Sequence, residues 1–433
     1  MPVKTLFKGV GGLLGEIPLS SVEANPDTSV ALEDLTTLTS YNLMPKAQKT
    51  IVVPGSPSIW NPRELPTRIK PDSGSYPADH CRVVFPKCPL EPLIRAVLVA
   101  HPDFNLSDVD LISDRRNLRL LLDFVNGVKS EFRINAEVVG STVLLSTWTE
   151  RKMVPVKGFA GYGREFEKAW TKAPVGVEGS MAHHRIVRYS LGGIKVIMRF
   201  EVDGCMRGEE EEEEDYGGPS KEGTDTSTTT TGYPNRRRRH HRRHHQHYHP
   251  SYEAFRTPTG CTILTRGTLT AASRIIEIKT GRVGRNLTTS RNLAQLWFSQ
   301  TPILCTGQYR TDGAFTHVSV KDVMLAGELS EWEERNRESL RKLVRLLELV
   351  REVVMKKKEK EKEKEEEKEK EKGEVVVGKC VLVFPQGGEA LRVYGWKGGK
   401  GMDMGVPTDL VERWKMCDGE AERENASLPL EVQ

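Results

Sequence analysis

The 433-residue sequence is poor in apolar residues and lacks the paired cysteines that mark a disulfide framework or a zinc site. Only 37% of its residues are hydrophobic and 7% are aromatic, whereas 29% are charged. No run approaches the ~18 consecutive apolar residues of a membrane helix, so we predict no membrane partner. The seven cysteines are scattered without a C-x-x-C pair, which favours reduced thiols in the cytosol or nucleus.

The shortage of apolar residues is confined to two segments. Residues 209–249 contain an acidic run, a Thr-rich run and an Arg/His run, and residues 356–372 consist of nine Lys and eight Glu. The first segment has too little to bury, so we predict a disordered acidic, Thr-rich and Arg/His-rich insertion over 207–251. The second is predicted to be a charged helical extension over 356–373, because Glu–Lys pairs support a solvated helix.

The remaining sequence has ordinary composition and is long enough to form a core. Helical and strand patterns alternate irregularly along it, which indicates an α+β (mixed α/β) fold. Glycines in a strand pattern predict a hairpin over 185–203, and an apolar stripe predicts one helix over 332–355. The other predicted divisions are a partly disordered leader (1–50), core segments (51–206 and 252–355), closing strands (374–400) and a flexible tail (401–433).

Charged residues alternate with apolar residues in two predicted strands, RFEVDGC (199–205) and RIIEIKTG (274–281). Alternate side chains of a strand share one face, so Glu201 points with Asp203 and Glu277 points with Lys279. If the strands are neighbours, three carboxylates and one lysine converge. Such carboxylates repel one another unless a cation lies between them, and oxygen ligands suit Mg²⁺ or Mn²⁺.

This arrangement suits metal-dependent hydrolysis of a phosphodiester, in which Lys279 orients the attacking water or neutralises charge on the phosphate. The pattern of an acidic strand before a carboxylate-x-Lys strand is the one used by PD-(D/E)XK nucleases. The alternative interpretation is a solvated ion pair on an exposed strand, which is the usual role of an isolated E-x-K triplet.

A third acidic motif precedes the two strands. GYGREFEKAW (161–170) places Glu167 near the start of a predicted helix, where Phe166 and Trp170 share one face. The alternative for this motif is a helix N-terminus stabilised by acidic side chains. The chain order is therefore G-x-x-F-E, then E-V-D, then E-I-K.

That order resembles the DXO/RAI family of decapping exonucleases, which have a PD-(D/E)XK-like core. Two further stretches are similar to the family, SDRRNLRLLLDF (113–124) and RNLAQLWFSQTPILCTGQYRTDGAF (291–315). The resemblance implies that Glu167, Asp203, Glu277 and the Ile278 carbonyl bind a divalent metal, Mg²⁺ or Mn²⁺. It also implies that Glu201 holds a second metal or its waters, that Lys279 serves the nucleophile, and that Arg115 and Gln300 contact the 5′ end of RNA.

The function implied by the resemblance is removal of 5′-triphosphates or of incomplete or non-canonical caps from RNA, with 5′–3′ exoribonuclease activity in some members. One alternative is a catalytically weak partner that stabilises a 5′–3′ exoribonuclease, and another is a DNA-directed nuclease on the same core. The implied partners are an RNA 5′ end and a 5′–3′ exoribonuclease. The expected location is the nucleus, with the cytoplasm as the alternative.

Overall fold

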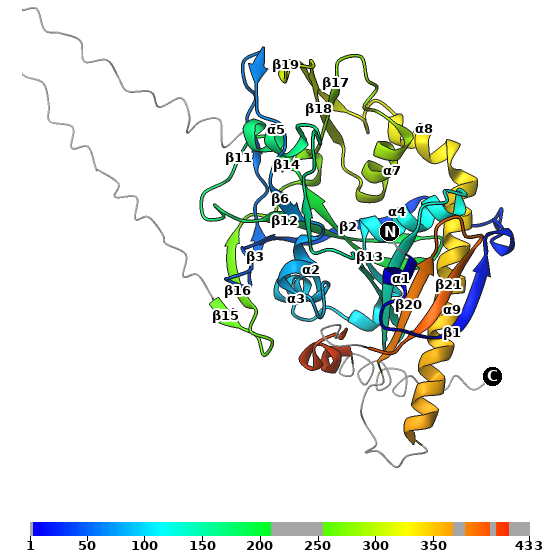
Figure 1. Ribbon diagram of the computed structural model, residues 1–433. Helices are drawn as coiled ribbons and strands as arrows, with labels where there is room; N and C mark the ends of the chain where they lie inside the picture. Colours follow the sequence, from blue (N-terminus) through cyan, green and yellow to red (C-terminus); the bar gives the residue numbers. More distant parts are fainter. Residues whose placement is uncertain (1–2, 209–253, 367–376, 399–403, 415–433) are drawn as a thin grey trace, which may run out of the picture.

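The computed structural model describes residues 3–208, 254–366, 377–398 and 404–414, which form two large β-sheets with helices packed against them (Figure 1). The predicted α+β class is confirmed. Most of the insertion expected over 207–251, and residues 367–373 of the charged extension, lie outside the described residues. Among the described helices, none is both long enough and apolar enough to span a bilayer.

The larger sheet has 12 strands and contains most of the core. In spatial order, its strands are β1 (Val10–Pro18), β21 (Ala390–Trp396), β20 (Gly378–Phe384), β8 (Phe132–Val139), β9 (Thr142–Thr147), β7 (Leu111–Asp114), β13 (Ile194–Val202), β12 (Ala182–Leu191), β2 (Leu32–Leu43), β3 (Thr50–Gly55), β16 (Thr262–Gly267) and β15 (Ala254–Arg256). The predicted hairpin is β12–β13, which turns at Gly192 and Gly193. Both glycines have positive φ, as this tight turn requires.

The smaller sheet has seven strands. In spatial order, they are β11 (Thr171–Lys172), β4 (Ile59–Trp60), β14 (Gly204–Cys205), β17 (Ile275–Arg282), β18 (Ile303–Tyr309), β19 (Ala314–Asp322) and β5 (Thr67–Arg68), and β10 (Met153–Pro155) pairs separately with β6 (Ser75–Pro77). The chain passes directly from β13 in the larger sheet to β14 in the smaller one, so the two sheets are joined at Asp203.

Helices cover both faces of the larger sheet. The helices are α1 (Val3–Leu6), α2 (His80–Val84), α3 (Glu91–Ala100), α4 (Arg115–Val125), α5 (Gly163–Trp170), α7 (Ser290–Ser299), α8 (Glu328–Arg335) and α9 (Arg337–Glu366), and single turns of 3₁₀ helix lie at Leu19–Ser21, Leu106–Asp108 and Ala272–Arg274. Apolar side chains of α4, α7, α8 and α9 pack on one face, and those of α2 and α3 pack on the other. Strand β13 serves both layers, because Met198 and Phe200 face the first while Ile197 faces the second.

The predicted helix over 332–355 is two helices, so that prediction is wrong at its start. Asn336 separates α8 from α9, and its side-chain amide donates to the Trp332 carbonyl at 2.7 Å. The Asn336 backbone N–H donates to the same carbonyl at 3.0 Å, so Asn336 caps the C-terminus of α8. The apolar stripe itself is buried as predicted, since Leu343, Leu347 and Val350 are at most 2% exposed.

Both ends of the chain contribute to the core. The region expected to be a partly disordered leader contains β1 and β2, which pair with β21 and with β12 in the larger sheet. Within the expected flexible tail, residues 404–414 pack beside α3, and the rest of that tail lies outside the described residues. Trp414 is fully buried there, and its indole N–H donates to the Thr142 hydroxyl at 3.0 Å.

We predict that Trp414→Ala lowers the free energy of unfolding by about 3–5 kcal/mol, because the change leaves a cavity in the core. The neighbouring control Glu412→Ala removes an exposed side chain and should change stability by less than about 0.5 kcal/mol. Chemical denaturation of the full chain measures both values. Equal stabilities of the two variants would contradict the packing of residues 404–414.

Candidate functional site

The candidate site lies where the two sheets join. Strand β14 pairs antiparallel with β17, with Gly204 opposite Ile276. This pairing brings Asp203, which precedes β14, beside Glu277 and Ile278 of β17. The convergence expected from the two charged strands is therefore present, although it runs through the two-residue strand β14 rather than through β13.

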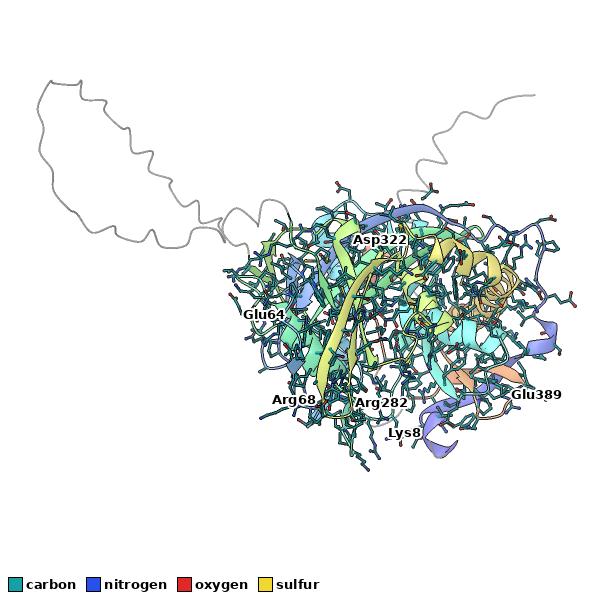
Figure 2. The ribbon with its side chains drawn as sticks, turned by 90° about the horizontal axis from the view of Figure 1, so that it is seen from above. Lys8, Glu64, Arg68, Arg282, Asp322 and Glu389 are labelled. Atoms are coloured by element: carbon teal, nitrogen blue, oxygen red, sulfur yellow. The ribbon has the colours of Figure 1, made fainter. Side chains whose placement is uncertain are left out.

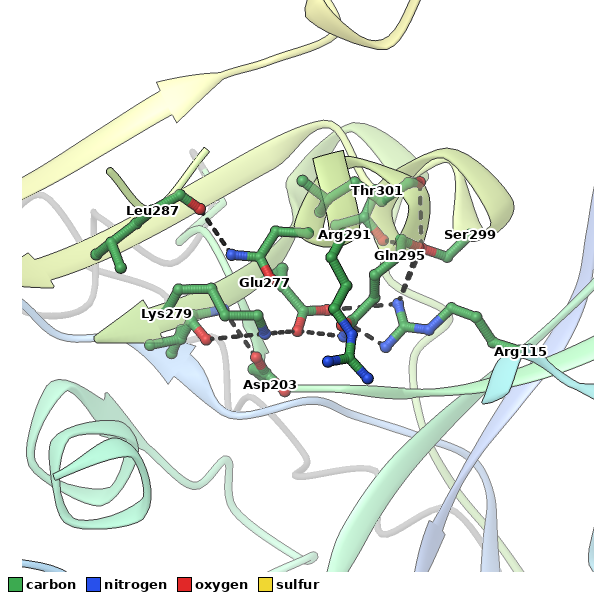
Figure 3. Close-up of polar contacts among 12 residues, drawn as sticks. Arg115, Asp203, Glu277, Lys279, Leu287, Arg291, Gln295, Ser299 and Thr301 are labelled. Atoms are coloured by element: carbon green, nitrogen blue, oxygen red, sulfur yellow. Dashed lines mark hydrogen bonds and ion pairs between the residues drawn. The ribbon is translucent and has the colours of Figure 1, made fainter. Parts of the chain in front are cut away.

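Glu277 is the most enclosed carboxylate of the site, with only 3% of its side chain exposed. Its Oε1 accepts from the Lys279 ammonium and, at 2.5 Å, from the Gln295 amide. Its Oε2 lies 3.4 Å from both terminal nitrogens of Arg115, and Figure 3 shows these contacts. Burial raises the pKa of Glu277, but the charges of Lys279 and Arg115 outweigh burial and lower it. Glu277 is therefore held as a carboxylate.

Asp203 has the opposite balance. Its Oδ2 accepts from the Ile278 backbone N–H at 2.7 Å. Burial and the nearby charge of Glu277 nevertheless raise the pKa of Asp203 to about 7, against the weaker lowering effects of Lys279 and the Ile278 N–H. Asp203 therefore carries a proton for much of the time near neutral pH.

Glu167 is placed by α5, which packs against β17 and is anchored by aromatic stacking. Phe166 and Trp170, predicted to share a face, stack with ring centroids 4.1 Å apart, and both are fully buried. Asp72 accepts hydrogen bonds from the backbone N–H groups at the start of α5. Burial, Asp203 and then Glu201 raise the pKa of Glu167 well above its ordinary value.

Glu201 lies at the end of β13 and is more open, with 48% of its side chain exposed. Its Oε2 is 3.5 Å from Nδ1 of His80, at the start of α2. Burial raises the pKa of Glu201, but the hydrogen bond and the charge of His80 more than offset that effect and lower it. His80 was not identified from the sequence, because a single histidine before a short helix carries no recognisable pattern.

The carboxylate cluster, defined as Glu167, Glu201, Asp203 and Glu277, has the donor chemistry of a site for a hard divalent cation. All its ligand atoms are oxygens, and burial followed by repulsion within the cluster raises the pKa values of Glu167 and Asp203. Among the described residues, however, no three His, Cys, Asp or Glu side chains stand ready to hold one ion.

Lys279 contacts two of the expected ligands. Its ammonium bonds Glu277 and lies 3.2 Å from the Ile278 carbonyl oxygen. The carboxylate and carbonyl oxygens of the cluster fit Mg²⁺ or Mn²⁺, which prefer oxygen ligands.

Of the two residues expected to contact RNA, Arg115 lies at the site and Gln300 does not. Gln300 ends α7 in the left-handed conformation (φ 48°), and its amide donates to the Trp297 carbonyl at 2.7 Å. It lines a small cavity of about 30 Å³ beside Phe200, on the opposite face of β13 from Glu201.

Gln295 occupies the place at the cluster where Gln300 was expected. The sequence signal for Gln295 is its position four residues before Ser299, on the same face of α7. Gln295 donates to Glu277, and the Ser299 hydroxyl accepts from Arg115.

Two cavities adjoin the cluster and share His80 and Glu201 as walls. The smaller, of about 250 Å³, also contains Glu167, Asp203, Arg164 and Lys168. The larger, of about 430 Å³, contains Arg115 and several further arginines. An elongated ligand crossing Glu201 can therefore contact both cavities.

Comparisons with known proteins agree with this architecture. A family model described as a domain of unknown function, DUF8563, matches residues 20–383. No curated protein matches the sequence. Three solved structures are similar to this chain over most of their length, all of them yeast Rai1 proteins.

Candida albicans Rai1, solved in complex with pU5 and Mn²⁺, has 9% identity and a TM-score of 0.52, and the match covers 93% of this chain and 99% of that one. Scheffersomyces stipitis Rai1, solved with (3′-NADP)⁺ and a calcium ion, has 11% identity and a TM-score of 0.51, covering 92% and 99%. S. pombe Rai1 has 12% identity and a TM-score of 0.50, covering 88% and 99%. The chain therefore belongs to the DUF8563 family and has the fold of the Rai1 proteins.

Proposed function

We propose that this chain is a divalent-metal-dependent hydrolase of RNA 5′ ends, acting on 5′-triphosphates or on incomplete or non-canonical caps. The observation that carries the proposal is the carboxylate cluster at the sheet junction, with Lys279 and Arg115 bonded to its most buried member. The shared fold supports it, because the Candida albicans Rai1 structure contains a 5′-phosphorylated oligonucleotide, pU5, together with Mn²⁺.

The proposed role of each residue follows from its position in the site. Glu167, Asp203, Glu277 and the Ile278 carbonyl would hold the metal, with Glu201 available for a second ion, and a bound Mg²⁺ or Mn²⁺ supplies Lewis acidity and an activated water. Lys279, once released from Glu277, is placed to orient that water or to neutralise charge on the phosphate. Arg115 is placed to bind a phosphate oxygen next to Glu277.

A purely structural partner of an exoribonuclease has no need of this cluster. Buried carboxylates cost free energy unless they are paired, and the raised pKa values of Glu167 and Asp203 show that their pairing is incomplete. Groups held in such an unfavourable state are typical of active sites, which favours an enzyme over a scaffold.

The first prediction concerns Asp203→Asn, which keeps an acceptor for the Ile278 N–H while removing the charge. Hydrolysis of 5′-triphosphate and capped RNA should fall by roughly 10²–10³-fold or more, because the variant would lose an anionic ligand of the metal that polarises the phosphate. A panel of 5′-modified RNAs, read for both end-group release and mononucleotides, measures this and separates decapping from exonuclease activity.

The matched control is Glu338→Gln, an exposed carboxylate on α9 that should retain full activity. Full activity in Asp203→Asn would contradict the assignment of the cluster. Inactivity of the wild type on every RNA would favour the scaffold alternative, and equal hydrolysis of DNA ends would favour a DNA-directed nuclease.

The second prediction concerns pH. Because the folded pKa of Asp203 is raised, its proton stabilises the native state at low pH, and that stabilisation is lost as pH rises through about 7. Metal binding needs the charged form, so the increase in melting temperature caused by Mg²⁺ should be small near about pH 6 and larger near about pH 8. Thermal unfolding with and without Mg²⁺ measures the difference, and Asp203→Asn should weaken its pH dependence. A pH-independent Mg²⁺ effect in the wild type would contradict the prediction.

A further inference from the structure

The larger of the two cavities, which we call the arginine cavity, is lined by four arginines from the starts of two helices. Arg115, Arg116 and Arg119 belong to the first five residues of α4, and Arg291 is the second residue of α7. Figure 3 shows Arg291 on the same side of α7 as Gln295. The positive ends of both helix dipoles add to the same field.

The cluster of like charges is energetically unfavourable without an anion. Burial, followed by the charges of Arg115 and Arg291, lowers the pKa of Arg119 to about 10. Arg119 reaches only neutral acceptors, the Gln295 side-chain oxygen at 3.0 Å and the Arg291 carbonyl at 3.5 Å.

The acidic residues of the same cavity do not neutralise this cluster by contact. Asp114 is bonded to Arg199 at 2.7 Å, and Asp79 accepts from the Arg82 backbone N–H to cap α2. Glu201 faces His80. The Asp123 side chain makes no hydrogen bond or ion pair with any described residue, although its charge interacts at longer range with Arg291 and Arg119.

Several donors consequently face the cavity without a partner. Within the described part of the chain, the side chains of Arg116 and Arg291 make no hydrogen bond or ion pair. Forked guanidinium groups in this state are suited to phosphate oxygens.

From these contacts we propose that the arginine cavity binds the oligophosphate of the substrate's 5′ end, and that Arg119 and Arg291 select RNA ends with more than one phosphate. The proposal rests on the proposed function and adds the recognition of the leaving group. Glu201 and His80 line both cavities, so a substrate whose α phosphate lies at the carboxylate cluster can extend its further phosphates past them into the arginine cavity.

For a 5′-triphosphate end, hydrolysis consumes one water. The water oxygen bonds to the α phosphorus, and the bond from that phosphorus to the α–β bridging oxygen breaks. Pyrophosphate then leaves with the bridging oxygen, and the protons of the water pass to the two phosphate products or to the buffer. The arginine cavity binds the pyrophosphate portion before and after this step through contacts between guanidinium groups and phosphate oxygens.

The test is metal-free binding of tripolyphosphate and of orthophosphate to the full chain, measured by calorimetry in the presence of a chelator. We expect tripolyphosphate to bind more tightly, and the double variant Arg119→Gln/Arg291→Gln to weaken that binding by about tenfold or more. The control Arg345→Gln/Arg392→Gln removes the same charge from side chains 40% and 41% exposed on α9 and β21, and it should bind as the wild type does. Melting temperatures establish that each variant is folded.

The outcomes separate this inference from the proposed function when hydrolysis of 5′-triphosphate RNA is measured on the same proteins. A KM raised by about tenfold in the Arg119/Arg291 variant, with kcat nearly unchanged, supports both. Unchanged tripolyphosphate binding in that variant, or equal affinity of the wild type for the two anions, overturns the inference whether or not hydrolysis occurs. Arginine-dependent binding without hydrolysis in the wild type supports the cavity as an oligophosphate site and removes the proposed function.

Discussion

Glu277 is a carboxylate with 3% of its side chain exposed, and its burial is offset by donors from three separate parts of the chain. Lys279 comes from its own strand, Gln295 from α7 and Arg115 from α4. A buried carboxylate is stable only when such partners are in place, so this one group fixes β17, α4 and α7 relative to one another. The remaining cluster members come from other elements: Glu167 from α5, Glu201 from the end of β13 and Asp203 from the link between β13 and β14.

The charges at this site that lack a bonded partner of opposite sign indicate what the site binds. The charge of Glu277 is stabilised, whereas burial and then repulsion between the carboxylates raise the pKa values of Asp203 and Glu167. On the other side of Glu201, Arg116, Arg119 and Arg291 have no bonded carboxylate among the described residues. Excess negative charge beside excess positive charge, separated by one shared wall, matches the charge pattern of a metal-bound phosphate with further phosphates attached.

The local sequence pattern correctly predicted which face of a strand or helix a side chain points to. Alternation alone predicts that Glu201 shares a face with Asp203 and that Phe200 points to the opposite side, and the structure has this arrangement. The stacking of Phe166 on Trp170 follows in the same way from helical spacing. The prediction that the two acidic strands adjoin required more than periodicity, and it came from the order of motifs along the chain.

The sequence pattern did not predict features whose conformation is set by packing between distant parts of the chain. Gln300 follows the last turn of α7 with positive φ, which turns its side chain back onto Trp297, and no spacing rule predicts that reversal. The strands within residues 10–43 have mixed composition, and they are held by pairing with β21 and β12 rather than by their own preference. His80 reaches Glu201 only because α2 packs against the larger sheet.

The passage of the chain through Asp203 has a consequence for how the molecule can be divided. The strand entering this residue belongs to one sheet and the strand leaving it belongs to the other. Carboxylates from both sheets therefore form the cluster, and their spacing depends on the angle between the two sheets. Neither half could be excised as an independent folding module with its chemistry intact, and a rigid-body displacement at that boundary would change the distances from Glu201 to Glu167 and Glu277.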